Sequence, residues 1–115
     1  MMNNLMLVGR LVNDLKCEKD EQERDVCNIT LAVSRPYKNA EGIYETDFID
    51  CRIWNNIAVT TAEYCRKGDL IGVRGRLQTA YYEDENGEKH KKMEVIAEKV
   101  TFLSCKKNNE ENESE

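Results

Sequence analysis

Apolar and polar residues alternate along residues 44–54, whose sequence is Y-E-T-D-F-I-D-C-R-I-W. This period of two predicts a β-strand, because successive strand side chains point to opposite faces of a sheet. One predicted face carries the apolar residues Ile49, Cys51 and Ile53 and is typical of a core. The opposite face, which should be solvated, carries two aromatic side chains and two charged ones: Phe48, Asp50, Arg52 and Trp54.

The same analysis predicts four further strands and one helix. The strands cover residues 5–12, 26–34, 70–82 and 89–104, and Asn86-Gly87 predicts a hairpin between the last two. Helical spacing of apolar residues predicts a helix over residues 57–66, ended by a C-cap at Gly68 with cations in the last turn. Residues 18–25 and 35–42 are predicted loops.

Five strands with a helix between the third and fourth form the order of the OB-fold, an oligonucleotide-binding barrel. We therefore predict an all-β protein, a five-stranded Greek-key barrel formed by residues 1–105. Residues 106–115 are predicted to be a short, acidic, disordered tail, since they hold two lysines and four glutamates.

The predicted strand at residues 70–82 adds a second face with polar chemistry. Period two places Arg74, Arg76, Gln78 and Tyr82 together, opposite the predicted core residues Ile71, Val73 and Leu77. Tyr81 should then face the core side. Lys89, Lys91 and Lys92 on the returning strand form either a solvated hairpin or a further nucleic-acid contact.

The net charge of −5 argues against a uniformly basic nucleic-acid binder. The excess of acidic residues is confined to two segments, however. Residues 18–25 hold five acids against two bases, and the tail accounts for the rest, so the strand-rich body is balanced. A local cationic groove is therefore compatible with the total. The acidic run itself is interpreted as a solvated loop, or as a repulsive element that restricts the path of DNA.

The five cysteines contain no C-x-x-C pair, and His90 is the only histidine of the chain. We therefore predict neither a bound metal nor a cofactor, and we interpret the cysteines as reduced and mostly buried in a cytoplasmic protein. The chain shows no signal-peptide pattern and no apolar run of membrane-spanning length. No catalytic constellation or phosphate-binding G-x-x-x-x-G-K-[ST] loop is present, so an enzyme is not predicted.

Five ordered segments resemble the bacterial-type single-stranded DNA-binding protein (SSB) family. They are L-V-G-R-L at residues 7–11, N-I-T-L-A-V-S at 28–34, F-I-D-C-R-I-W at 48–54, Y-C-R-K-G-D at 64–69 and V-R-G-R-L at 73–77. Tyr82, ahead of Asn86-Gly87, also resembles the family pattern. Together the segments extend over nearly the whole predicted barrel.

The resemblance implies sequence-independent binding and protection of single-stranded DNA in replication, recombination or repair. It implies a homo-oligomer, usually a homotetramer, with replication or recombination proteins as further partners. By position, it assigns base stacking to Tyr37, Phe48, Trp54 and Tyr82. The cations expected to hold phosphates are Arg10, Arg35, Lys38, Arg52, Lys67, Arg74 and Arg76.

This sequence departs from the family pattern near the predicted stacking residues. Asp47 and Asp50 flank Phe48, and Asn55 and Asn56 follow Trp54 where cations are common, so we expect weaker and more salt-sensitive binding. The short tail lacks the apolar tip that recruits other enzymes in many relatives, and it resembles short-tailed paralogues.

Each assignment has an alternative. Trp54 could instead cap the core, and Phe48 could lie under a neighbouring subunit. Arg52 could form a surface ion pair with Asp50 or Glu45. At the level of function, the alternatives are an OB-fold adaptor that binds a replication or primosome protein, and an RNA-binding module of the cold-shock kind. Salt-insensitive binding would indicate the adaptor, and a preference for RNA would indicate the RNA module.

Overall fold

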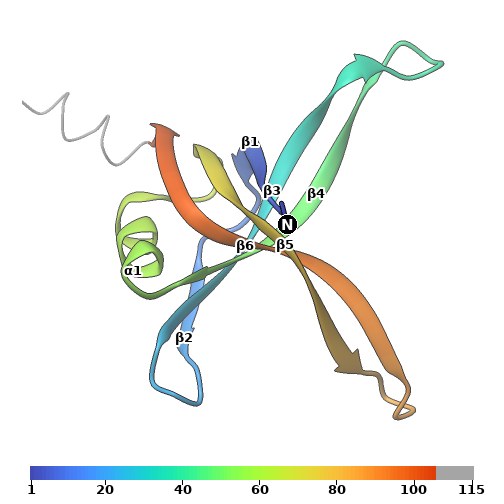
Figure 1. Ribbon diagram of the computed structural model, residues 1–115. Coiled ribbons are helices and arrows are strands. Elements are labelled where there is room, and N and C mark those ends of the chain that lie inside the picture. The colour runs from blue at the N-terminus through green and yellow to red at the C-terminus, as the bar shows by residue number, and fades with distance from the viewer. Residues whose placement is uncertain (106–115) are drawn as a thin grey trace, which may run out of the picture.

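The computed structural model describes residues 1–105, and the predicted tail at residues 106–115 lies outside them. Six strands and one helix make up this part of the chain (Figure 1). In chain order they are β1 (Leu5–Leu11), β2 (Lys16–Lys19), β3 (Asp25–Lys38), β4 (Tyr44–Trp54), α1 (Asn55–Tyr64), β5 (Leu70–Glu83) and β6 (Lys89–Ser104).

Five of the strands close into a barrel. Neighbours are hydrogen-bonded in the order β1-β5-β6-β4-β3, and an additional pairing of β1 with β3 completes the ring. The β4–β6 pair is parallel, and the other pairs are antiparallel. Since α1 separates the third and fourth barrel strands, the predicted five-stranded barrel and the place of its helix are confirmed.

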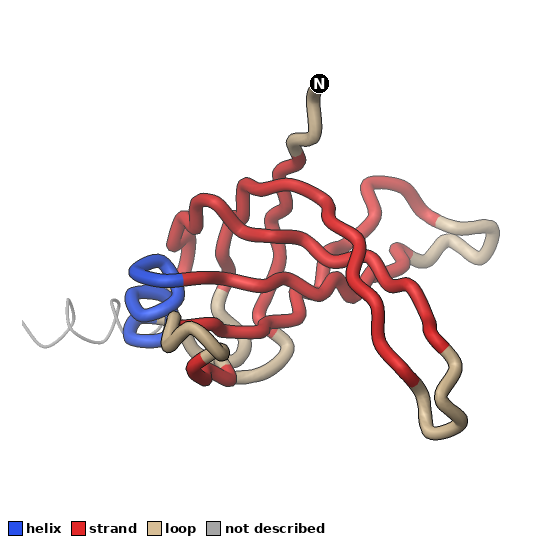
Figure 2. Tube along the Cα trace, turned by 60° about the horizontal axis from the view of Figure 1, so that its bottom comes forward, coloured by secondary structure: helices blue, strands red, loops and turns tan. Residues whose placement is uncertain are grey.

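The β3–β4 and β5–β6 hairpins extend well beyond the barrel. They project on the side away from α1 and diverge from each other, as Figures 1 and 2 both show. The predicted loop at residues 35–42 is therefore partly wrong, because β3 continues to Lys38, which pairs with Tyr44. The pairing is irregular between Ser34 and Lys38, the segment that contains Pro36, a residue with no N–H to donate.

Strand β2 was not predicted, and part of the predicted loop at residues 18–25 belongs to it. It forms a short hairpin with the start of β3, in which Cys17 lies directly opposite Cys27. The two cysteines form a disulfide, so the prediction that all cysteines are reduced is wrong for this pair. Directly opposed residues of an antiparallel pair lie close enough for their sulfurs to bond, which the sequence spacing does not reveal. Cys51, Cys65 and Cys105 are free and buried.

The barrel interior is a single apolar core that includes Leu11, Leu31, Ile53 and Ile71, each fully buried. Cys51 and Ile53 face this core and Ile49 packs against it, so the alternation predicted for residues 44–54 is confirmed.

The predicted core position of Leu77 is wrong. Its side chain is 40% exposed, because the pairing of β5 with β1 ends at Gly75 and Leu77 lies beyond it.

Helix α1 begins and ends two residues earlier than predicted. Trp54, in an extended conformation, precedes its first turn, and Ala58 and Thr61 are its buried residues. Cys65 ends the helix, so the predicted C-cap at Gly68 and the cations in the last turn are wrong. Arg66 lies just beyond that end, and its guanidinium donates a hydrogen bond to the Ala62 carbonyl at 3.1 Å. Within residues 1–105, no helix is long and apolar enough to cross a membrane.

Three hairpin loops share one turn geometry. An Asp or Asn opens each loop, and its Oδ1 accepts hydrogen bonds from the backbone N–H groups two and four residues later. The opening residues are Asp20, Asn39 and Asp84. The residue three positions after each opening residue has a positive φ, at Glu23 (62°), Gly42 (79°) and Gly87 (78°). Glu23 therefore occupies a left-handed position that glycine fills in the other two loops.

This comparison predicts opposite effects at equivalent positions. Glu23→Gly should raise the free energy of unfolding by about 0.5–1 kcal/mol, because a left-handed L-residue costs about 1–2 kcal/mol and glycine's extra unfolded-state entropy offsets part of the gain. Gly42→Ala and Gly87→Ala should each lower it by about 1 kcal/mol. Urea unfolding followed by circular dichroism measures all three.

Glu23→Ala is the matched control, because it removes the same charge but keeps a β-carbon at the strained position. If Glu23→Ala stabilised the protein as much as Glu23→Gly, charge rather than backbone conformation would be the cause.

Candidate nucleic-acid interface

The outward side of β4 forms the middle of a mixed aromatic and charged surface. Phe48, Asp50, Arg52 and Trp54 alternate with the core residues of this strand, as predicted, and Phe48 is 67% exposed. The β3 register places Asn28 opposite Arg52 and sets Thr30 and Ala32 beside the next two outward positions. The alternation that fills the core thus also aligns these four side chains along one outer row.

Strand β6 joins this row to β5. Ile96 pairs with Arg52 on one side and with Arg76 on the other, so both arginines lie on the outer side of the sheet. We call this surface the outer face; its polar and aromatic members are Asn28, Thr30, Phe48, Asp50, Arg52, Trp54, Arg76, Gln78, Lys92 and Glu94. A pocket of about 300 Å³ lies in it, bordered by Arg52, Lys92, Asp50 and Glu94 among others.

Carboxylates accompany the cations of the outer face. Glu94 is buried, and its carboxylate lies 3.7 Å from the Arg52 guanidinium and 3.9 Å from the Lys92 ammonium. Arg52 also donates a hydrogen bond to Asn28 Oδ1 at 3.2 Å. The ion pair predicted as the alternative for Arg52 exists, but its partner is Glu94 rather than Asp50 or Glu45. These contacts fix the guanidinium in place beside the pocket.

Trp54 is partly buried and has a cation over its ring. The Arg24 guanidinium carbon lies 4.6 Å from the ring centroid, and Arg24 Nε also bonds Asp20 Oδ2 at 2.8 Å. The sequence analysis missed Arg24, which belongs to the acidic run interpreted as a solvated loop. The register of β3 against β4, which sets Val26 beside Trp54, brings this hairpin over the indole. No local sequence pattern reports that pairing.

Phe48 borders a second pocket at the mouth of the barrel. This pocket, of about 340 Å³, is lined mainly by apolar side chains, including those of Leu77 and Met93. Both are exposed, and neither was predicted as part of the site. Exposed apolar groups beside an aromatic ring form a flat surface that suits the faces of bases.

The β3–β4 hairpin carries Tyr37, Lys38 and Arg35 away from the outer face. Tyr37 is exposed, and the Lys38 ammonium lies 5.7 Å from the Tyr44 ring centroid. Arg35 is held by two carboxylates: Asp47 Oδ1 lies 2.9 Å from its Nη2, and Glu45 contacts its Nη1. The hydrogen bond from Arg35 lowers the pKa of Asp47 below its ordinary value. A phosphate would have to compete with these acids for Arg35.

The β5–β6 hairpin carries the last predicted aromatic residue, Tyr82. Its ring stacks on His90 at a centroid distance of 5.3 Å, and His90 Nε2 lies 2.7 Å from Asp84 Oδ2. The prediction that Tyr81 faces the core is wrong: it is 70% exposed, against 51% for Tyr82, because this stretch projects beyond the barrel. The two tyrosines line one pocket of about 500 Å³ with Glu83 and Lys89.

The remaining predicted cations lie toward β1. Arg10 is on β1, and its guanidinium donates to the Gly68 carbonyl at 3.1 Å, which places it near Lys67. Arg74 lies two residues before Arg76 on the same side of β5, as predicted, and it pairs with Met6 on β1 and with Lys99 on β6. The structure thus brings together Phe48, Trp54, Arg52 and Arg76, and leaves the other predicted contacts on the two hairpins and along β1.

A closed five-stranded barrel with one helix between its third and fourth strands, and with aromatic and cationic side chains on an outer sheet face, defines a protein of the oligonucleotide-binding barrel class. Comparison with known proteins refines this class. The model of the single-strand binding protein family matches residues 2–103, and the chain belongs to that family.

Individual relatives agree with this assignment. The chain is 44% identical over 106 residues to single-stranded DNA-binding protein B of Bacillus subtilis, covering 92% of this chain and 94% of the relative. It is 44% identical over 108 residues to single-stranded DNA-binding protein 3 of Listeria innocua, covering 94% of this chain and 68% of the relative. A single-stranded DNA-binding protein of Bacillus cereus is 46% identical over 103 residues, 90% of this chain and 61% of the relative.

The Arg35–Asp47 pair gives the β3–β4 hairpin a defined pH dependence. We expect Asp47 to titrate below the ordinary aspartate pKa of 3.8, and Arg35→Ala to move its pKa up toward that value. Because the pKa is lowered in the folded state, the stabilisation is present above the ordinary pKa and is lost as the pH falls through the folded one. Carboxyl carbon chemical shifts measured by NMR against pH test this.

Asp84 on the other hairpin, whose pKa is lowered by its hydrogen bonds with His90 and the Glu88 N–H, serves as the internal reference in both proteins. Equal Asp47 titration curves with and without Arg35 would contradict the pairing.

Proposed function

We propose that this protein binds single-stranded DNA, as the names of its relatives say of them, and that it binds without sequence preference and protects the DNA. The observation that carries the proposal is the outward row of β4, which sets two aromatic side chains and an arginine on one face of a barrel of this family. Every base has a π face, so stacking on Phe48 and Trp54 tolerates any sequence and contributes ~1–3 kcal/mol per base.

The phosphates would lie between these rings. Arg52 and Arg76 flank β6 beside Phe48 and Trp54, and Arg24 adds a cation directly at the indole. Arg76 is held less firmly than Arg52. Arg76 donates a hydrogen bond to Gln78 at 3.1 Å, whereas Arg52 lies against a buried carboxylate. We therefore expect Arg76 to gain more from a bound phosphate.

The two hairpins extend the proposed surface. Tyr37 on β3–β4 and the Tyr81–Tyr82 pair on β5–β6 offer further stacking positions, and Lys38 and Lys89 lie next to them. Figure 2 shows that the two hairpins diverge from each other. A DNA strand that contacts both must therefore curve over the outer face. The family resemblance also assigns phosphate contacts to Arg10, Lys67 and Arg74. These contacts would require the DNA strand to continue around the barrel toward β1.

We further propose that the protein acts as a homo-oligomer, with a homotetramer expected from the family resemblance. The outward side of β1 and its neighbours supports self-association. Met6, Val8 and Leu103 are exposed apolar side chains, and all three border one pocket of about 240 Å³ with Gly72. A grouped apolar sheet face of this kind is typical of a contact between subunits.

The proposed role is binding without catalysis, in the cytoplasm, during DNA replication, recombination or repair, with proteins of those pathways as partners. One alternative has a specific observation in its favour. Arg35 and Arg52 are already paired with carboxylates and the net charge is −5, which suits an adaptor whose aromatic face binds another protein. Salt dependence separates the two, because phosphate contacts release counterions.

Trp54 provides the first test, because it is the only tryptophan and reports directly on its own ring. We expect titration with oligo-dT to quench its fluorescence, strongly at low salt and less at moderate salt. Phe48→Ala should weaken binding about 5- to 150-fold, the equivalent of the stacking energy of one base. Trp54→Ala, read by filter binding, should show a loss of similar size.

Val59→Ala is the matched control, because Val59 is an exposed apolar residue on α1, outside the outer face. Its affinity should equal that of the wild type. Unchanged fluorescence, together with salt-insensitive binding or with no binding at all, would count against the DNA interface and in favour of the adaptor.

The arginines make a separate prediction about salt. For a single strand, the slope of log K against log salt changes by about 0.7 for each phosphate neutralised. Arg76→Ala should flatten the slope by about that amount, whereas Arg35→Ala should change it less, since Asp47 and Glu45 already occupy that guanidinium. Equal slopes for the wild type and Arg76→Ala would exclude a phosphate at Arg76.

Self-association has its own measurement. Sedimentation equilibrium of the wild type should give the mass of an oligomer, and Val8→Lys should reduce it, because an ammonium in the apolar face cannot be buried without a partner. Val59→Lys, the same change at an exposed apolar residue of α1 outside this pocket, should leave the mass unchanged. A monomeric wild type would contradict the proposed assembly but would not contradict the proposed DNA interface.

A further inference from the structure

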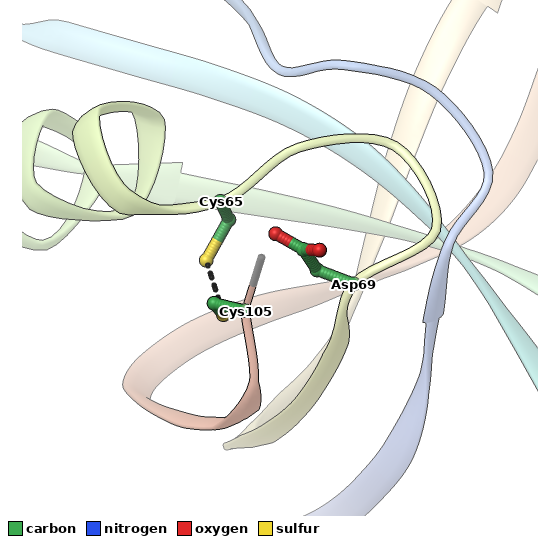
Figure 3. Close-up of side chains that lie close together, drawn as sticks. All are labelled: Cys65, Asp69 and Cys105. Carbon is green, nitrogen blue, oxygen red and sulfur yellow. Dashed lines mark hydrogen bonds between the residues drawn. The ribbon is translucent and has the colours of Figure 1, made fainter. Parts of the chain in front are cut away.

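A cluster of buried donor side chains lies at the end of the barrel that α1 covers, away from the outer face. It consists of Cys65, Asp69 and Cys105, each 3% exposed or less. The Cys65 and Cys105 sulfurs are 3.4 Å apart, and one donor atom from each of the three residues lies within 4.8 Å of the other two. Figure 3 shows the carboxylate of Asp69 directed toward the two sulfurs.

Three separate elements hold the donors in place. Cys65 ends α1, and its N–H donates to the Thr61 carbonyl at 2.9 Å. Asp69 directly precedes β5, and its Oδ2 accepts a hydrogen bond from the Arg66 N–H at 2.7 Å. Cys105 follows the last residue of β6, Ser104, which pairs with Leu70. Each donor therefore lies directly beside the end of a helix or strand.

Two thiols and a carboxylate match the ligands of a thiophilic divalent cation. Zinc binds cysteine sulfur at about 2.3 Å in a tetrahedral arrangement, which separates two bound sulfurs by roughly 3.8 Å. The observed 3.4 Å is within a few tenths of an ångström of this value. The carboxylate completes a three-ligand set and leaves one tetrahedral position for another donor. In residues 1–105, Cys51 is the other free cysteine, and it is not part of this cluster.

We propose that Cys65, Asp69 and Cys105 bind a single thiophilic divalent cation of the Zn²⁺ or Cd²⁺ type. On binding, each thiol releases its proton to solvent, and the two thiolates and the carboxylate donate electron pairs to the metal. The ion would join the end of α1 to the end of β6. The prediction of no bound metal rested on the absence of closely spaced ligand pairs, whereas these ligands are separated by up to 40 residues along the chain.

Cadmium titration tests the proposal, because cadmium thiolates have an ultraviolet charge-transfer band that needs no functional assay. The full chain is stripped with chelator and kept anaerobic without added thiols, so that the Cys17–Cys27 disulfide stays closed. A thiol assay in denaturant first confirms the three free cysteines. We expect the band to saturate at one ion per chain and the thermal unfolding midpoint to rise with both Cd²⁺ and Zn²⁺.

Variants assign the ligands. Cys65→Ala and Cys105→Ala should each abolish tight binding, and Cys51→Ala, the matched change at a buried thiol outside the cluster, should keep the wild-type band. Asp69→Asn can still accept the bond from Arg66, and it should weaken cadmium affinity by roughly tenfold or more. Cooperative unfolding of each variant without metal establishes that it is folded.

Three results would overturn the proposal. One is the absence of the band in the folded wild type, and another is an undiminished band in Cys65→Ala or Cys105→Ala. The third is a Cys65–Cys105 cross-linked peptide, found by mass spectrometry in oxidised protein, when the reduced protein takes up no metal; the cluster would then be a redox pair.

Discussion

The double pairing of β1 is the constraint on which the rest of the structure depends. This strand bonds to β5 from Leu5 to Arg10, and at its far end it also bonds to β3 through Arg10 and Leu11. Because the ring is closed, the inward side chains of all five strands form one core. A barrel strand cannot turn about its own axis without exposing apolar side chains. The outward row of β4 is fixed by the same condition. Core packing therefore determines which side chains are presented to a ligand.

Cations are paired with acids both on the outer face and on the β3–β4 hairpin, and the two pairings differ in their physical character. Arg35 and Asp47 form an ion pair on an exposed hairpin, where solvent screens the charges and the pair contributes little to stability. Arg52 instead lies against Glu94, a carboxylate almost removed from solvent. That acid needs a nearby cation, so the guanidinium serves both the fold and the surface. An acidic chain can thus present ordered cations locally.

The sequence permitted prediction of those features that depend on local periodicity. The alternation at Phe48 to Trp54, the place of the helix and the five barrel strands all follow from patterns shorter than twenty residues. Features set by tertiary pairing were missed. The Cys17–Cys27 disulfide and the contact of Arg24 with Trp54 both depend on the β2 hairpin, which has no apolar alternation of its own. The period of two also gave wrong predictions of burial at Leu77 and Tyr81. Alternation indicates which face a side chain is on, but it does not show where the barrel ends.

The parallel pairing of β4 with β6 has a consequence for folding. Cys51 pairs with Val95 and Ile53 with Ala97, so the ring contains a seam between segments that are more than forty residues apart. Contacts of such separation form late, because the entropy of closing the intervening chain must be overcome first. On the ribosome, β4 and β5 keep open edges until the last strand has emerged. Barrel closure therefore waits for β6, and until then the open edges of β4 and β5 are exposed to aggregation.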